Sequence, residues 1–110
     1  MARIEDGELS LEIEGATADQ LRSAVAAARR SFEEAGIDMV AAFAAQAQVD
    51  QAYQAELAWE QGAAAEPAEV SAAVLALSDA ADAAWTAAVH AAGFDPGEHL
   101  VVGQLGLVAP

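Results

Sequence analysis

The sequence predicts an α+β fold that is mainly α-helical: a three-helix bundle with an N-terminal β-hairpin and a C-terminal strand. Three observations lead to this prediction. The N-terminal segment alternates apolar and polar side chains around a turn, three long alanine-rich segments follow, and the C-terminal segment is apolar and partly β-branched. Because no linker is long enough to separate two units, we expect one domain over residues 1–110.

The N-terminal segment, residues 1–14, is predicted to form the hairpin. Asp6-Gly7 is a dipeptide typical of a type I′ turn, and a two-residue turn at this point pairs Ile4 with Leu9. The apolar side chains then share one face of the hairpin: Ile4, Leu9, Leu11 and Ile13. Two strands alone are marginally stable, so this face needs a third strand or a helix to cover it.

The C-terminal segment, residues 99–109, is the best candidate for that third strand. It is apolar and contains β-branched valines, and Gly103 and Gly106 interrupt it. We expect it to be either a strand that pairs with the hairpin or a free tail.

Capping residues and apolar spacing place the three helices at residues 17–35, 38–61 and 67–92. Thr17 and Gln20 have the spacing of a capping box, and Asp38 is suited to cap the second helix. Pro67 fits the first position of the third helix. In the second helix Met39, Phe43, Val49, Tyr53 and Leu57 form one apolar stripe.

Acidic residues dominate the charge of the chain. There are 18 of them against four basic residues, which gives a formal net charge of -14. All four basic residues are arginines that precede Ser31: Arg3, Arg22, Arg29 and Arg30. Such a charge repels phosphate groups, so we expect no nucleic acid and no membrane as partner. Halophily, genome composition and function remain alternative explanations of the acidic bias.

Arg29 and Arg30 each lie four residues before a glutamate, Glu33 and Glu34. This spacing predicts weak ion pairs on a solvated helix face. The chain has no cysteine, and its first residues lack the pattern of a signal peptide. No apolar stretch approaches the ~18 residues that a membrane span needs. We therefore expect a soluble, cytoplasmic protein.

The sequence contains no established catalytic or nucleotide-binding motif. Asp50 is the best single candidate for acid-base chemistry, because it falls inside the apolar stripe of the second helix, beside Gln46 and Tyr53. The alternatives are an edge residue that reaches water and a structural hydrogen-bond partner of Tyr53 or the backbone. We predict no catalytic residue, and we do not expect an enzyme.

A second cluster of titratable side chains follows the third helix: His90, Asp95, Glu98 and His99. Imidazoles and carboxylates at such short separations could meet around Zn²⁺ or another divalent ion. The spacing matches no established motif, and the helix dipole also explains a histidine at a helix C-terminus. We predict no metal and no cofactor, although the sequence alone leaves a metal site at these residues open.

Trp59-Glu-Gln-Gly62, between two predicted helices, resembles the Trp-x-Gly turn of small acidic type VII secretion proteins. The spacing here is one residue longer. The hairpin and the apolar C-terminal segment are also foreign to the helical hairpin of that family. The resemblance covers four residues, and we assign the chain to no family on it.

Three apolar features indicate contact with proteins. Trp59 lies off the main stripe of its helix, one flank of the third helix is lined by alanines, and the C-terminal segment is apolar. The predicted interface residues are Trp59, Ala72, Ala76, Ala83, Ala87, Leu105 and Leu107. We expect a non-catalytic protein-protein interaction protein whose partner is another protein, itself or both.

Such a protein would be a homo-oligomer or a small subunit of a larger assembly, for which a virion, a microcompartment and an accessory subunit are suitable settings. Two alternatives remain. The first is an acidic decoy or inhibitor of a basic surface, and the second is a small metal-binding protein or enzyme.

Overall fold

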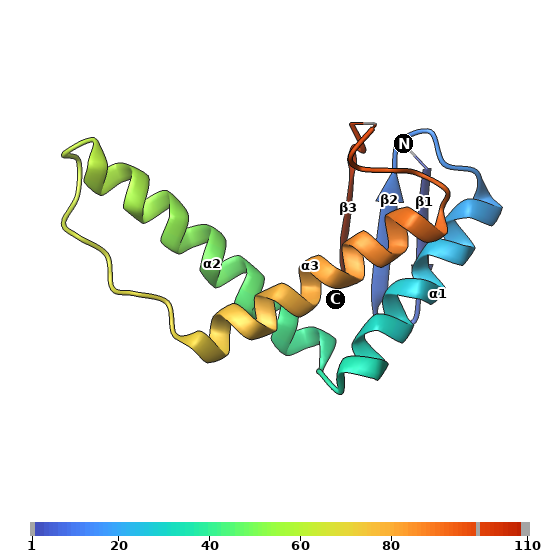
Figure 1. Ribbon diagram of the computed structural model, residues 1–110, viewed down its shortest axis with the longest axis horizontal. Coiled ribbons are helices and arrows are strands. Elements are labelled where there is room, and N and C mark those ends of the chain that lie inside the picture. The colour runs from blue at the N-terminus through green and yellow to red at the C-terminus, as the bar shows by residue number, and fades with distance from the viewer. Residues whose placement is uncertain (1, 99, 109–110) are drawn as a thin grey trace.

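The computed structural model of the protein describes residues 2–98 and 100–108 and confirms the mainly α-helical α+β fold (Figure 1). The elements in chain order are β1 (Ala2–Asp6), β2 (Leu9–Ile13), α1 (Ala18–Ala35), α2 (Met39–Glu60), α3 (Ala72–Ala91) and β3 (Gly103–Leu107). The three strands form one antiparallel sheet in the order β1-β2-β3. The C-terminal segment therefore contains a strand that completes the sheet, as the sequence predicts, while His99 and Ala109 lie outside the described residues.

The hairpin register differs from the predicted one. Asp6 pairs with Leu9, and Ile4 pairs with Leu11 instead of Leu9. The turn therefore consists of Gly7 and Glu8. Gly7 has a φ of 60°, whereas no non-glycine residue among those described has a positive φ. This combination fits a type II′ turn, which needs a glycine only at its first central position, whereas type I′ would force Glu8 into the left-handed region. The pairing partner of each β1 residue thus moves by two positions along β2. Because side chains alternate between the two faces of a strand, a shift of two residues leaves the predicted apolar face unchanged.

The core lies between the sheet and two helices. α1 packs against β1 and β2, and α3 packs against both α1 and α2. Leu9, Leu11 and Ile13 on β2 are fully buried, and they belong to the same apolar cluster as Phe32 on α1. Leu105 of β3 pairs with Leu11 and extends this cluster.

Both α1 and α3 contribute alanines to the core. Ala24 and Ala28 on α1 and Ala84 and Ala88 on α3 are fully buried in the core cluster. Such small side chains let two helix backbones approach closely, so the exact size of each side chain matters where they meet. The alanine content of the chain therefore has a packing role besides its helix propensity.

The predicted caps of the first two helices are present. The Thr17 side chain accepts a hydrogen bond from the Gln20 backbone N–H, and the Gln20 side chain accepts one from the Thr17 backbone N–H. Asp38 accepts a hydrogen bond from the N–H of Val40 at the start of α2. These contacts satisfy backbone donors that a helix start leaves without partners.

The third helix begins later than predicted. The sequence analysis places its start at Pro67, but α3 starts at Ala72 with Ser71 as its N-cap. The Ser71 hydroxyl accepts a hydrogen bond from the Val74 N–H at 3.2 Å, which a proline side chain cannot do. Residues 61–71 instead form a long connection that passes along the C-terminal half of α2 (Figure 1).

The predicted apolar stripe of α2 is only partly covered, with Met39 and Phe43 packed against the core cluster. The buried residues of α2 are Ala42 and Ala45, whereas Tyr53 is 59% exposed. The reason is that α2 crosses α3 with its N-terminal half, and its C-terminal half projects away from the sheet (Figure 1). The molecule accordingly measures 47 × 29 × 29 Å. Its Cα radius of gyration is 15.4 Å, compared with about 13 Å for a compact domain of this length.

Contrary to the sequence analysis, one helix within the described residues, α3, is long and apolar enough by length and composition to cross a membrane. It nevertheless packs between α1 and α2, and its buried side chains include Ser78, Ala81 and Val89. An alanine-rich helix that packs against two other helices can also have this composition, so length and composition alone are weak evidence for a membrane span.

Candidate interaction surfaces

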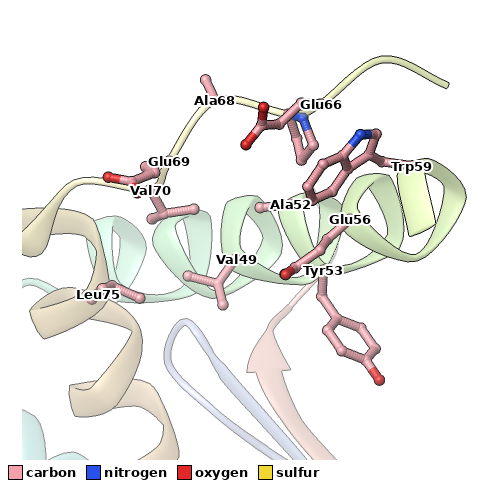
Figure 2. Close-up of a pocket in the computed structure, with 11 residues that line it drawn as sticks. Val49, Ala52, Tyr53, Glu56, Trp59, Glu66, Ala68, Glu69, Val70 and Leu75 are labelled. Atoms are coloured by element: carbon pink, nitrogen blue, oxygen red, sulfur yellow. The ribbon is translucent and has the colours of Figure 1, made fainter.

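An open groove of about 560 Å³ lies between the C-terminal half of α2 and the connection to α3 (Figure 2). Val49 and Ala52 line it from α2, and Val70 and Leu75 line it from the opposite side. Trp59 forms one end of the groove, with its indole ring beside the connection (Figure 2). The Trp59 side chain is only partly covered, with 41% of its surface exposed. We call this feature the Trp59 groove.

Three carboxylates line the same groove. Glu56 comes from α2, and Glu66 and Glu69 come from the connection. All three residues are exposed. The Trp59 groove therefore combines an apolar floor with negatively charged margins, and the sequence has no lysine or arginine after Arg30 to neutralise them.

The predicted alanine flank of α3 is at the surface. Ala72, Ala76 and Ala83 are exposed, and Ala87 is half-buried. α1 and α2 occupy the other sides of α3, so this flank is not covered within the molecule. Leu75 lies one turn from Ala72 and also lines the Trp59 groove, so the two surfaces adjoin.

The structure separates the two predicted interface leucines of the C-terminal strand. Leu105 is 8% exposed and packs in the core of the monomer, whereas Leu107 is 38% exposed. Leu107, Val102 and Leu100 are exposed apolar residues of the C-terminal segment, with Leu100 exposed by 92%.

The candidate acid-base residue Asp50 is exposed at the surface of α2, which matches the alternative of an edge residue that reaches water. Gln46, which the sequence analysis places beside Asp50, forms a hydrogen bond with a residue of another helix. The Gln46 side-chain amide donates a hydrogen bond to Asp82 of α3 at 2.8 Å and joins the two helices. This contact joins residues that are far apart in the chain, so local sequence patterns do not reveal it.

The titratable cluster after α3 is not assembled in the part of the chain that the structure describes. Asp95 accepts a hydrogen bond from the Gly97 N–H at 2.9 Å and shapes the local turn. His90 and Glu98 are exposed, and His99 lies outside the described residues. Among the described residues, no group of three or more histidines and carboxylates is arranged to hold a metal ion.

Three of the arginines contact carboxylates of their own chain. Arg3 lies 3.0 Å from Glu5 and 3.7 Å from Glu12, and Arg22 pairs with Asp19. Arg29 does not pair with Glu33 as predicted. Its guanidinium reaches the hairpin, where it donates a hydrogen bond to the Asp6 carbonyl at 2.7 Å and lies 3.5 Å from the Asp6 carboxylate. The contact between Arg29 and Asp6 thus replaces the predicted Arg29–Glu33 ion pair, which would be weak on an isolated helix.

The end of α2 carries the four residues that resemble a Trp-x-Gly turn. The Gly62 N–H donates a hydrogen bond to the Trp59 carbonyl at 2.9 Å, and a long connection follows instead of a tight helical hairpin. Comparison of the chain with family models, with curated proteins and with solved structures gave no match.

Proposed function

We propose that this protein is a non-catalytic protein-binding subunit that works by association with itself or within a larger assembly. The supporting observation is the exposed area of the chain, 6696 Å². A compact monomer of 11.2 kDa exposes about 5,700 Å², so the excess is about 1,000 Å². A stable interface buries about 800 Å² on each partner, which this excess can supply.

The uncovered apolar side chains indicate which surfaces take part. The alanine flank of α3 is flat and has few rotatable bonds to order, so contact there costs little side-chain entropy. Trp59 adds the residue type that contributes most often to interface energy. We propose the α3 flank as the surface for self-association.

The test is the molar mass in solution, measured by light scattering over a range of protein concentrations. The wild type should exceed the monomer mass. Ala76→Glu combined with Ala83→Glu should return it to the monomer, because both changes place charge and bulk in the flank. The matched control is Ala26→Glu with Ala35→Glu, which adds the same charge at exposed alanines of α1 and should leave the mass unchanged.

Circular dichroism separates association from folding in this experiment. All variants should keep the helical signal of the wild type. A wild type that stays monomeric at millimolar concentration would reject self-association. A flank variant that unfolds would show that the α3 flank supports the monomer instead of an interface.

An acidic decoy of a basic surface is the second candidate. The net charge of -14 favours it, and three of the arginines are already engaged within the chain. Binding by a decoy should depend on carboxylates such as Asp79 and should weaken steeply with salt. Binding through the apolar surfaces should instead depend on Trp59 and persist in salt. Comparing Asp79→Asn with Trp59→Ala in the binding assay distinguishes the two.

A further inference from the structure

The Trp59 groove has a shape and composition that suit an elongated apolar ligand. Its floor is formed by aliphatic side chains such as Val49 and Leu75, and Trp59 stands at one end. Its volume of about 560 Å³ is in the range of small-molecule sites, but it is open along its length. A groove between a helix and an extended segment is a common geometry for the apolar anchors of a peptide.

The charge of the groove identifies the kind of partner. Glu56, Glu66 and Glu69 line it, so a ligand that fills the floor must approach three carboxylates. No lysine or arginine follows Arg30 in the sequence, so the segment that forms the groove has no basic side chain of its own to pair with these carboxylates. Because the three carboxylates are exposed, each single ion pair contributes little, but together they favour a ligand with several cations.

A second copy of this chain does not fit the groove. Two grooves placed face to face would bring six like charges together, which opposes association. A second copy also offers few cations for three glutamates, since Arg3, Arg22 and Arg29 already contact carboxylates of their own chain and Arg30 is the fourth and last arginine. The groove therefore differs from the α3 flank, which is lined mainly by alanines, with the exposed Asp79 one turn from both Ala76 and Ala83.

We propose that the Trp59 groove binds a basic segment of a different protein, in which apolar anchors contact Trp59 and the aliphatic floor while lysines or arginines pair with the three glutamates. This inference rests on the proposed function as a protein-binding subunit, and it names the partner class of one surface. Together, the α3 flank and the groove would let the protein associate with itself and hold another component at the same time.

The first experiment is selection from a display library of random 16-residue peptides on the immobilised full-length protein. Peptides that also bind the Trp59→Ala variant are removed. The enriched peptides should carry more lysine and arginine than the input library, together with an aromatic or branched aliphatic residue. Failure to enrich any Trp59-dependent peptide, or enrichment of neutral or acidic ones, would overturn the proposal.

The second experiment measures the affinity of the best selected peptide by fluorescence anisotropy. Trp59→Ala should weaken binding at least tenfold. Glu56→Gln, Glu66→Gln and Glu69→Gln combined should also weaken it at least tenfold and should flatten its salt dependence. The control combines Glu14→Gln, Glu33→Gln and Glu34→Gln, which are exposed carboxylates outside the groove with the same total charge change. It should change the affinity less than threefold, and equal effects of the two triple variants would overturn the proposal.

The two tryptophans provide an internal control for the binding site. On addition of the peptide, the indole N–H resonance of Trp59 should shift in a ¹H–¹⁵N spectrum. The resonance of Trp85, which is half-buried and packs against the core cluster, should remain in place. A shift of Trp85 alone would place the peptide elsewhere and overturn the proposal.

These results are independent of self-association. If the peptide experiments fail while light scattering still shows an oligomer that the α3 flank variant dissociates, the groove inference is wrong and the proposed function stands. If the wild type is monomeric and no peptide is enriched, both fail.

Discussion

Arg29 joins α1 to the hairpin turn through a single side chain. Its guanidinium donates a hydrogen bond to the Asp6 carbonyl at 2.7 Å and lies near the Asp6 carboxylate. Arg29→Ala should lower the free energy of unfolding by about 1 kcal/mol, which is less than a buried charge-assisted hydrogen bond contributes because both groups are partly exposed. Urea unfolding followed by circular dichroism measures this change.

Arg30 is the matched control for Arg29. It is the next residue on the same helix, it carries the same charge, and it is exposed. Arg30→Ala should change the free energy of unfolding by less than about 0.5 kcal/mol. Equal effects of the two substitutions would attribute the result to net charge and contradict a specific role for the contact with Asp6.

Gly103 allows β3 to lie close to β2. A Cβ atom at this position would lie 2.1 Å from the Glu12 carbonyl oxygen, which is backbone and cannot rotate away. Gly103→Ala should therefore cost about 2 kcal/mol or more, in the upper part of the range for overpacking. The change is measured as a lower midpoint of thermal unfolding.

Gly106 offers a comparison within the same strand. The nearest atom to a Cβ atom there, Nε2 of Gln104, is 4.0 Å away and belongs to a flexible side chain. Gly106→Ala should cost less than about 0.5 kcal/mol, because alanine suits a strand at least as well as glycine does. Similar losses for both variants would show that β3 does not approach β2 as closely as described.

Among the elements, α3 shows best how one helix has two different alanine surfaces. Ala84 is fully buried in the core cluster that joins α1 and α3, whereas its neighbour Ala83 is exposed. Ala84→Leu should destabilise the protein by about 1–3 kcal/mol because the added methyl groups force the helices apart. Ala83→Leu should leave the free energy of unfolding within about 0.5 kcal/mol of the wild-type value.

Urea unfolding compares these two variants, and light scattering adds a second measurement on Ala83→Leu. If Ala84→Leu is as stable as the wild type, the close approach of α1 and α3 is wrong. The same sequence pattern, alanine at helical spacing, thus has opposite consequences on the two sides of α3, and only the position of the neighbouring helices decides between them.

At the scale of the whole molecule, the net charge of -14 has to be accommodated in a small, elongated fold. The ion pairs of Arg3, Arg22 and Arg29 are all partly exposed, so they offset little of the repulsion. Raising the ionic strength from about 0.01 M to about 1 M shortens the screening length from about 30 Å to about 3 Å. The midpoint of thermal unfolding should rise by about 4 °C or more, which corresponds to about 1 kcal/mol in a domain of this size.

Scanning calorimetry in sodium chloride measures this rise. The variant with Glu14→Gln, Glu33→Gln and Glu34→Gln is a useful comparison, because it lowers the charge at exposed positions. It should be more stable than the wild type at low salt and should respond less to added salt. A thermal midpoint that does not change with salt in either protein would show that self-repulsion does not limit stability.

The class of the fold and most of its elements could be predicted from local sequence patterns. Local signals are sufficient for this, since Thr17 and Gln20 cap a helix through neighbouring backbone groups, and the alternation around Gly7 selects the apolar face of the hairpin. Two local predictions were wrong: α3 begins at Ala72 with Ser71 as its N-cap and not at Pro67, and the hairpin turn is Gly7-Glu8 and not Asp6-Gly7.

Tertiary structure alone decided which apolar residues are covered. Trp59 and Leu107 could be named as interface candidates from sequence, but the burial of Leu105 depends on its pairing with Leu11 across the sheet. The Trp59 groove likewise exists because α2 extends past α3 and the connection returns alongside it. Local propensity sets the type of each element, whereas exposure depends on contacts between residues that are distant in sequence, and a single sequence does not reveal those contacts.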